Sequence, residues 1–236
     1  MLYWTLKVIL TPLLRGGFRV RIEGREQLPR RGPVIFAANH RSFLDSMFLP
    51  MAIGWRRLTF VAKAEYFEQR RTAWFFRGVG QIPIQRSGGG AGDAALRAAT
   101  DVLERGRAFG IYPEGTRTRD GVTHRGHTGV ARLALATGAP IVPVGLVGTD
   151  DCQPTDRKLP RLFRPVTIRF GAPIHPDRYR EDAEGLALRA LTDEVMFEIV
   201  QLCGVYEYRD TYATKQPEDL PARPARLPSM PTAQVA

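Results

Sequence analysis

The chain has 236 residues, an ordinary length for one domain, and 44% of them are hydrophobic, which is enough to form a buried core. Lys and Arg number 34 against 24 Asp and Glu, a formal net charge of +10, so the partners to expect are polyanions such as nucleic acid, an anionic membrane or phosphorylated substrates. The two cysteines, Cys152 and Cys203, are too few for a disulfide framework and indicate a reducing compartment.

Residues 1–16 contain a mostly apolar stretch in which Leu2, Leu6, Ile9 and Leu13 share one helical face. The stretch is shorter than the ~20 residues that span a bilayer, and it lacks the basic start and the cleavage site of a signal peptide. Because apolar residues exceed one face, we expect a helix that lies in the membrane interface. A helix packed on the domain is the alternative.

A short apolar run, residues 33–38, predicts a buried strand that leads directly into Asn39–Asp45, which reads NHRSFLD and is followed by a helical pattern. Such a strand-to-helix turn is where α/β proteins place chemistry. If the helix begins near Ser42, Asp45 can accept a hydrogen bond from one imidazole nitrogen of His40 and leave the other free to take a proton. Ser42-x-x-Asp45 also fits a helix capping box, so the spacing alone leaves both interpretations open.

The next segments carry basic and aromatic residues. A strand predicted at 58–62 is followed by Lys63, and a strand predicted at 80–86 ends in Arg86. Between them, residues 66–80 are rich in aromatic side chains and fit either a second membrane-facing or acyl-contacting surface or part of the core. The glycine-rich loop that follows lacks the Lys-Ser/Thr ending of a P-loop, so nucleotide binding is not indicated.

A strand predicted at 109–112 delivers the segment PEGTR. Gly115 allows the backbone to approach a ligand closely, Thr116 offers a hydroxyl, and Arg117 offers a guanidinium fork matched to phosphate oxygens. Glu114 is expected to bind an acceptor hydroxyl or to hold an arginine in place. A surface turn with an Arg–Glu pair is the alternative.

The NHxxxxD segment after a strand, followed downstream by YPEGTR, resembles the glycerolipid acyltransferase family, whose best-known members make phosphatidic acid from lysophosphatidic acid. The resemblance covers roughly residues 20–200. It implies that Arg86 meets the phosphate of the acceptor, and it makes Lys63 a candidate ligand, with a solvated lysine as the alternative. Family members often carry a lysine shortly before the position of Gly129, where this chain has Arg125 and His127 instead, so a ligand contact from that loop is in doubt.

Strands and helices alternate from residue 33 to 147, which predicts an α/β fold: a single domain with a largely parallel central sheet flanked by helices, plus the N-terminal interfacial helix. We expect the acyltransferase domain at residues 17–210 and a disordered tail at 211–236. Further strands are predicted at 18–23, 141–144 and 166–170, and further helices at 93–105, 129–136 and 186–202.

The favoured function is acyl transfer from a thioester, acyl-CoA or acyl-carrier protein, to the free hydroxyl of 1-acylglycerol 3-phosphate, forming phosphatidic acid. His40 would act as general base and Asp45 would orient it. No G-x-S-x-G elbow is present, which counts against an acyl-enzyme route. Asn39 or a backbone N–H near the helix start is a candidate for stabilising the oxyanion. No cofactor is expected, and no metal either, because the HxxH segment at His124 lacks a partner carboxylate.

Other functions remain open. The acceptor could instead be glycerol 3-phosphate, another lysolipid or a glycolipid, and a basic membrane-tethered binding protein is the non-enzyme alternative. A nucleic-acid partner is not expected, because neither a basic helix nor stacking aromatic residues on a sheet are evident. The expected location is the cytoplasmic face of the cell membrane, as a peripheral or monotopic protein on an anionic surface.

Overall fold

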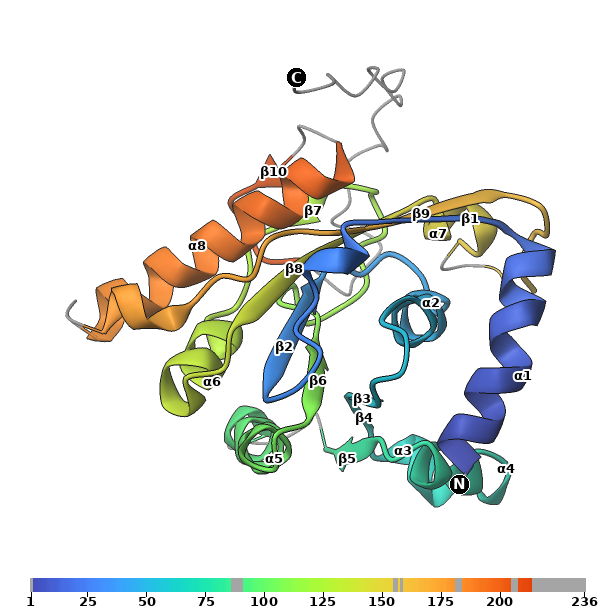
Figure 1. Ribbon diagram of the computed structural model, residues 1–236, viewed down its shortest axis with the longest axis horizontal. Coiled ribbons are helices and arrows are strands. Elements are labelled where there is room, and N and C mark those ends of the chain that lie inside the picture. The colour runs from blue at the N-terminus through green and yellow to red at the C-terminus, as the bar shows by residue number, and fades with distance from the viewer. Residues whose placement is uncertain are drawn as a thin grey trace.

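The computed structural model describes residues 2–85, 91–154, 157, 159–180, 184–204 and 208–213. At its centre is a six-stranded sheet of order β1-β9-β8-β2-β6-β3 (Figure 1), in which all neighbouring strands are parallel except β8 and β9. The strands are β1 (Arg19–Glu23), β2 (Val34–Ala38), β3 (Leu58–Thr59), β6 (Ala108–Ile111), β8 (Ile141–Val147) and β9 (Pro165–Phe170). The predicted α/β architecture with a largely parallel sheet is confirmed.

Helices cover both faces of this sheet (Figure 1), as expected for parallel strands joined by crossovers. Helices α1 and α2 pack on one face, and α5, α6 and α8 pack on the other. The helices are α1 (Leu2–Gly17), α2 (Asp45–Ala52), α3 (Glu65–Glu68), α4 (Arg70–Gly78), α5 (Ala91–Glu104), α6 (Gly129–Thr137), α7 (Thr149–Cys152) and α8 (Glu184–Cys203), with 3₁₀ turns at Arg25–Gln27 and Pro176–Tyr179.

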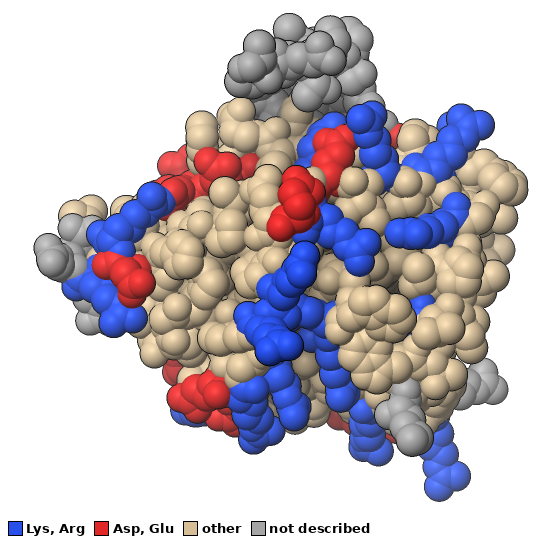
Figure 2. Space-filling model, viewed as in Figure 1, with Lys and Arg blue, Asp and Glu red and all other residues tan. Residues whose placement is uncertain are grey.

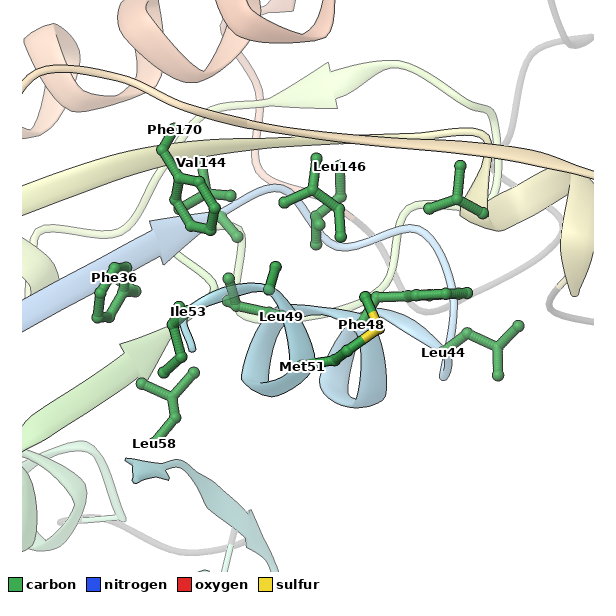
Figure 3. Close-up of a cluster of buried hydrophobic side chains, with 14 of the residues drawn as sticks. Phe36, Leu44, Phe48, Leu49, Met51, Ile53, Leu58, Val144, Leu146 and Phe170 are labelled. Atoms are coloured by element: carbon green, nitrogen blue, oxygen red, sulfur yellow. The ribbon is translucent and has the colours of Figure 1, made fainter. Parts of the chain in front are cut away.

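Strand β2 is buried on both faces, which explains its continuous apolar sequence. Phe36 belongs to the core beneath α2, where its ring meets Phe170 at a centroid distance of 6.2 Å, and Leu49 of α2 lies in the same cluster (Figure 3). Ile35 and Ala37 belong to the core on the opposite face. Fully burying a side chain of this size contributes roughly 1.5–3 kcal/mol, so both cores fix the strand and the turn at its end.

Two small parallel sheets lie apart from the main one: β4 (Val61–Lys63) pairs with β5 (Ile82–Ile84), and β7 (Thr123–His124) pairs with β10 (Tyr208–Arg209). The single strand expected at 58–62 is therefore divided at Phe60. The backbone of Phe60 explains the break, because its N–H donates to Gln81 Oε1 at 2.6 Å and its carbonyl accepts the N–H of Ile82 at 3.0 Å. The chain leaves the main sheet there.

Helix α1 has an inner and an outer side. Tyr3 and Leu14 are buried, and Tyr3 Oη accepts the N–H of Leu58 at 3.0 Å, so the helix packs on the domain. Its exposed apolar residues are Trp4, Val8, Ile9 and Leu13. Across the described residues, no helix has the length and apolar character needed to cross a bilayer. The interfacial position of α1 stays a prediction, as does the expected tail, whose residues 214–236 lie outside the described part.

Candidate active site

The turn after β2 brings the predicted His–Asp pair together. β2 ends at Ala38 and α2 begins at Asp45, and the intervening turn folds His40 back over the start of the helix. His40 Nδ1 lies 2.9 Å from Asp45 Oδ2. The carboxylate is fully buried, whereas the imidazole keeps 17% exposure and lines a cavity. Because Asp45 occupies Nδ1, Nε2 is the ring nitrogen left to act on a ligand.

The same carboxylate also closes the turn that leads into the helix. Asp45 Oδ2 accepts the backbone N–H of Arg41 at 2.8 Å and that of Ser42 at 2.7 Å. The bond from Ser42 is the return half of a capping box, and Ser42 Oγ accepts the N–H of Leu44 at 3.3 Å. The His40–Asp45 contact and the Ser42–Asp45 bond that the spacing allowed are thus both present, and the bonds within the turn fix the carboxylate beside His40.

Tyr112 holds the imidazole from its face, a role that the sequence did not reveal. The rings of His40 and Tyr112 stack at a centroid distance of 3.9 Å and an angle of 9°. Tyr112 Oη shares a 3.0 Å hydrogen bond with Ser46 Oγ on α2, and Phe60 stacks nearly parallel to Tyr112 at 5.5 Å. Burial, reinforced by the Asp45 carboxylate, raises the pKa of Tyr112 well above its usual range, so the phenol stays protonated. The sequence feature that could have pointed to Tyr112 is its position directly before PEGTR.

Glu114 connects the two sequence motifs through the backbone. Its Oε1 accepts the N–H of His40 at 3.2 Å and its Oε2 accepts the N–H of His124 at 2.9 Å. Burial raises the pKa of Glu114 to about 7, and the two backbone hydrogen bonds and the Arg41 charge oppose that rise. Its side chain is 1% exposed and does not line the cavity. These contacts differ from both expected roles, because the carboxylate is turned into the protein instead of toward an acceptor or an arginine ion pair.

The other residues of the PEGTR turn differ in whether they line the cavity. Thr116 and Arg117 line the cavity with His40, and so does Lys63 from the end of β4. Gly115 does not. It has a left-handed φ of 72°, and a Cβ there would lie 3.1 Å from the ring of His127. The glycine is therefore explained by backbone conformation and tight packing, and not by the close approach to a ligand that the sequence suggested.

The cavity has a volume of about 370 Å³ and joins a basic region to an apolar wall. The basic side chains are Lys7, Lys63, Arg117 and Arg119, with His40 and Thr116 beside them. The apolar wall comes from α1, α2, β4, α4 and the residue just after α4: Leu6, Leu10, Leu14, Met47, Met51, Val61, Phe75, Phe76 and Val79. A cationic region next to a hydrocarbon-like wall fits an amphiphile with an anionic head.

Asn39 is another predicted site residue that does not line this cavity. Asn39 is fully buried, and its side-chain amide makes two hydrogen bonds to the backbone of β8. Nδ2 donates to the carbonyl of Leu146 at 2.9 Å, and Oδ1 accepts the N–H of Leu146 at 2.7 Å. This geometry supports a structural role and gives no support to the expected oxyanion contact. Arg86 lies outside the described residues, so its role stays a prediction.

A second His–Asp pair lies behind the PEGTR turn. His124 Nε2 is 2.9 Å from the buried Asp120 Oδ2, and His124 Nδ1 is 3.2 Å from the carbonyl of Thr211. Arg209 of β10 also bonds Asp120, at 3.2 Å. The carboxylate that the HxxH segment seemed to lack is thus present, four residues before His124. Within the described ranges, no three or more His, Cys, Asp or Glu residues gather as a group that could hold a metal ion.

The fold and the His–Asp turn define a class of protein. A family model described as Acyltransferase matches residues 19–147, more than half of the chain. The chain therefore belongs to the acyltransferase family, and its predicted family resemblance is confirmed. The matched region includes His40, Asp45 and the PEGTR turn.

Particular relatives agree with this assignment. The chain is 29% identical to a chloroplast 1-acyl-sn-glycerol-3-phosphate acyltransferase of Arabidopsis thaliana, over 67% of this chain but only 44% of that protein. It is 28% identical to the 1-acyl-sn-glycerol-3-phosphate acyltransferase of Bacillus subtilis, over 84% of this chain and 92% of that one. A solved structure, the 1-acyl-sn-glycerophosphate acyltransferase of Thermotoga maritima, matches with a TM-score of 0.66 and 25% identity, covering 86% of this chain and 79% of that chain.

Proposed function

We propose that this protein transfers a fatty acyl group from a thioester to the free hydroxyl of 1-acylglycerol 3-phosphate, forming phosphatidic acid. The observation that carries the proposal is the His40–Asp45 pair, whose imidazole opens onto a cavity with both basic and apolar walls. The names of the relatives supply the acceptor. A non-catalytic binding protein would have no use for an oriented base in that position.

The reaction follows from the positions of the two side chains. His40 Nε2 removes the proton of the acceptor hydroxyl, and the oxygen attacks the carbonyl carbon of the thioester. The resulting tetrahedral oxyanion collapses, the carbon–sulfur bond breaks, and the thiolate takes the proton from the imidazolium. Asp45 holds the imidazole by Nδ1 and stabilises its positive form between the two proton transfers.

The acceptor phosphate is assigned to the basic region of the cavity. Arg117 and Lys63 supply positive charge there, and Thr116 supplies a hydroxyl donor. Arg86, expected from the family's second motif, would add to this set. The acyl chains are assigned to the apolar wall, where Phe75, Phe76 and other side chains replace water.

The proposed location is the cytoplasmic face of the cell membrane, as a peripheral or monotopic protein. One side of α1 supplies Leu6 and Leu10 to the cavity while its other side exposes Val8 and Ile9, so a lipid in the bilayer would lie close to the site. The net charge of +10 favours an anionic surface.

The test is an assay of purified full-length protein with a panel of acceptors and both donor types. 1-Acylglycerol 3-phosphate, glycerol 3-phosphate, other lysolipids and a glycolipid are each offered with acyl-CoA and with acyl-carrier protein, and products are identified by mass spectrometry. Phosphatidic acid formed with the wild type and lost in His40→Ala is the expected result. Acylation of a different acceptor alone would replace the proposed substrate, and no acyl transfer under any condition would overturn the proposal.

A further inference from the structure

A loop that the proposed reaction does not use lies beside the C-terminal end of α1. Residues 159–164, here called the 159–164 loop, read LPRLFR and lead into β9. All six residues are exposed, and three are large and apolar: Leu159 is 79% exposed, Leu162 54% and Phe163 64%. Exposure of such neighbours in one short loop is typical of an interaction surface.

The backbone of this loop is strained at the aromatic residue. Phe163 has a φ of 60°, which makes it the one residue other than glycine with a positive φ in the described part of the chain. A left-handed conformation is unfavourable for a side chain with a Cβ, and a bulky aromatic residue has no local polar contact to offset it. Glycine would serve the turn better, so the exposed ring itself needs a reason.

The loop is fixed to α1. The N–H of Phe163 donates to the carbonyl of Gly17 at 2.7 Å, and the N–H of Arg19 donates to the carbonyl of Arg164 at 3.1 Å. In Figure 1 the gold segment that leads into β9 reaches the upper end of α1. The 159–164 loop therefore lies at the C-terminal end of α1, the end opposite Trp4, and adds exposed apolar residues to those of the helix.

We propose that the 159–164 loop inserts into the headgroup zone of an anionic lipid bilayer together with the outer side of α1. The inference rests on the membrane location in the proposed function and extends it to a second segment, distant in sequence. Arg161 and Arg164 flank the apolar pair Leu162 and Phe163, the pattern expected for insertion beside anionic headgroups. Figure 2 shows Lys and Arg side chains spread over the right-hand half of the molecule, where few acidic side chains appear. A second copy of this chain would meet like charge there.

The experiment measures binding of the full-length protein to vesicles of phosphatidylcholine, with and without phosphatidylglycerol. In Phe163→Gly the backbone strain is relieved, so the melting temperature should stay equal or rise, while binding to anionic vesicles should weaken about tenfold because the inserted ring is lost. Phe197→Ala on α8 removes another exposed phenylalanine, 59% exposed, and should bind as the wild type does. A double variant, Arg161→Gln with Arg164→Gln, should weaken binding to anionic vesicles and leave neutral ones unchanged.

The outcomes separate the two proposals. A wild type that binds neither vesicle would overturn the membrane location and the loop's role with it. Equal binding to anionic vesicles by the wild type, Phe163→Gly and the arginine double variant would overturn the loop's role alone. The proposed function would then stand. Sedimentation velocity tests the alternative that the loop binds a second copy of the chain. A wild-type dimer that dissociates in Phe163→Gly would support that alternative and overturn insertion of the loop into the bilayer.

Discussion

Two His–Asp pairs in this protein have the same separation and different surroundings. His40 and Asp45 lie 2.9 Å apart, and so do His124 and Asp120, and both carboxylates are fully buried. The His40 ring, however, lines the cavity, whereas the His124 ring is 6% exposed and has contacts at both nitrogens, with Asp120 at one and the Thr211 carbonyl at the other.

The comparison teaches that a carboxylate beside an imidazole does not by itself make a base. Proton transfer needs the second ring nitrogen to reach a substrate, and only the geometry around His40 leaves it able to do so. At His124 the pair joins β7 to the C-terminal segment through Asp120, Arg209 and Thr211. We therefore expect chemistry from the first pair and stability from the second.

The largest expected effect separates the two histidines. His40→Ala should lower turnover by about 10²–10⁴-fold, the usual range for a lost general base, with little change in melting temperature. His124→Ala should lower the melting temperature, because the buried Asp120 loses one of its hydrogen bonds and the Thr211 carbonyl loses its contact with the ring, and change turnover by less than about tenfold. Steady-state kinetics and thermal melts of both variants measure this. A fully active His40→Ala would remove the assignment of the site.

The carboxylates sharpen the comparison. In Asp45→Asn the amide oxygen can take the place of Oδ2 beside His40 Nδ1 and the backbone N–H groups of Arg41 and Ser42, but a neutral amide lacks the negative charge that stabilises an imidazolium. Turnover should therefore fall by about 10²-fold or more in a well-folded protein. Asp120→Asn, the matched change, should leave turnover nearly unchanged. Near-normal activity of Asp45→Asn would reduce Asp45 to a helix cap.

Each pair also has an arginine nearby, and the two should behave differently. Arg117 lines the cavity, so Arg117→Ala should raise the KM for the acceptor by about tenfold or more, the loss of one charge-assisted contact of roughly 1.5–3 kcal/mol, with a smaller effect on the donor. Arg209→Ala removes an arginine that contacts Asp120 and should leave both KM values unchanged. Equal effects of the two variants would argue against phosphate binding by Arg117.

Glu114 joins the two pairs, and its substitution should have the smallest effect on turnover and a distinct effect on stability. Its pKa of about 7 in the folded protein lies above the ordinary 4.5, so the unfolded chain loses this proton first as pH rises. The unfolding free energy of the wild type, compared with that of Glu114→Gln, should therefore fall as pH rises from 4.5 to 7, by on the order of 3 kcal/mol at most. Denaturant unfolding at several pH values measures the difference.

The control for Glu114 is Glu104→Gln, which removes the same charge from an exposed position of α5. It should follow the wild-type pH dependence. If the unfolding free energies of wild type and Glu114→Gln keep a constant difference from pH 4.5 to 7, the elevated pKa of Glu114 is wrong.

The sequence by itself determined the alternating architecture and the position of the His40–Asp45 pair. Continuous apolar runs such as residues 34–38 must be buried on both faces, and a turn with His and Asp at this spacing can close locally over the first helical turn. The His40–Asp45 contact was predictable for that reason, since five residues of chain and a helix start are enough to form it.

Only the tertiary structure decided what surrounds that pair. Tyr112 stacks on the His40 ring, Glu114 accepts the backbone N–H of His40, and the backbone of Leu146 pairs with the side-chain amide of Asn39. All three partners come from strands or turns far along the chain. Sequence spacing carries no information about such contacts, because they depend on strand order and on which way a buried side chain turns. For the same reason, the sequence did not show that Asp120 is the partner of His124. Nor did it show that the other nitrogen of His124 contacts the Thr211 carbonyl, which leaves this histidine without a route to a substrate.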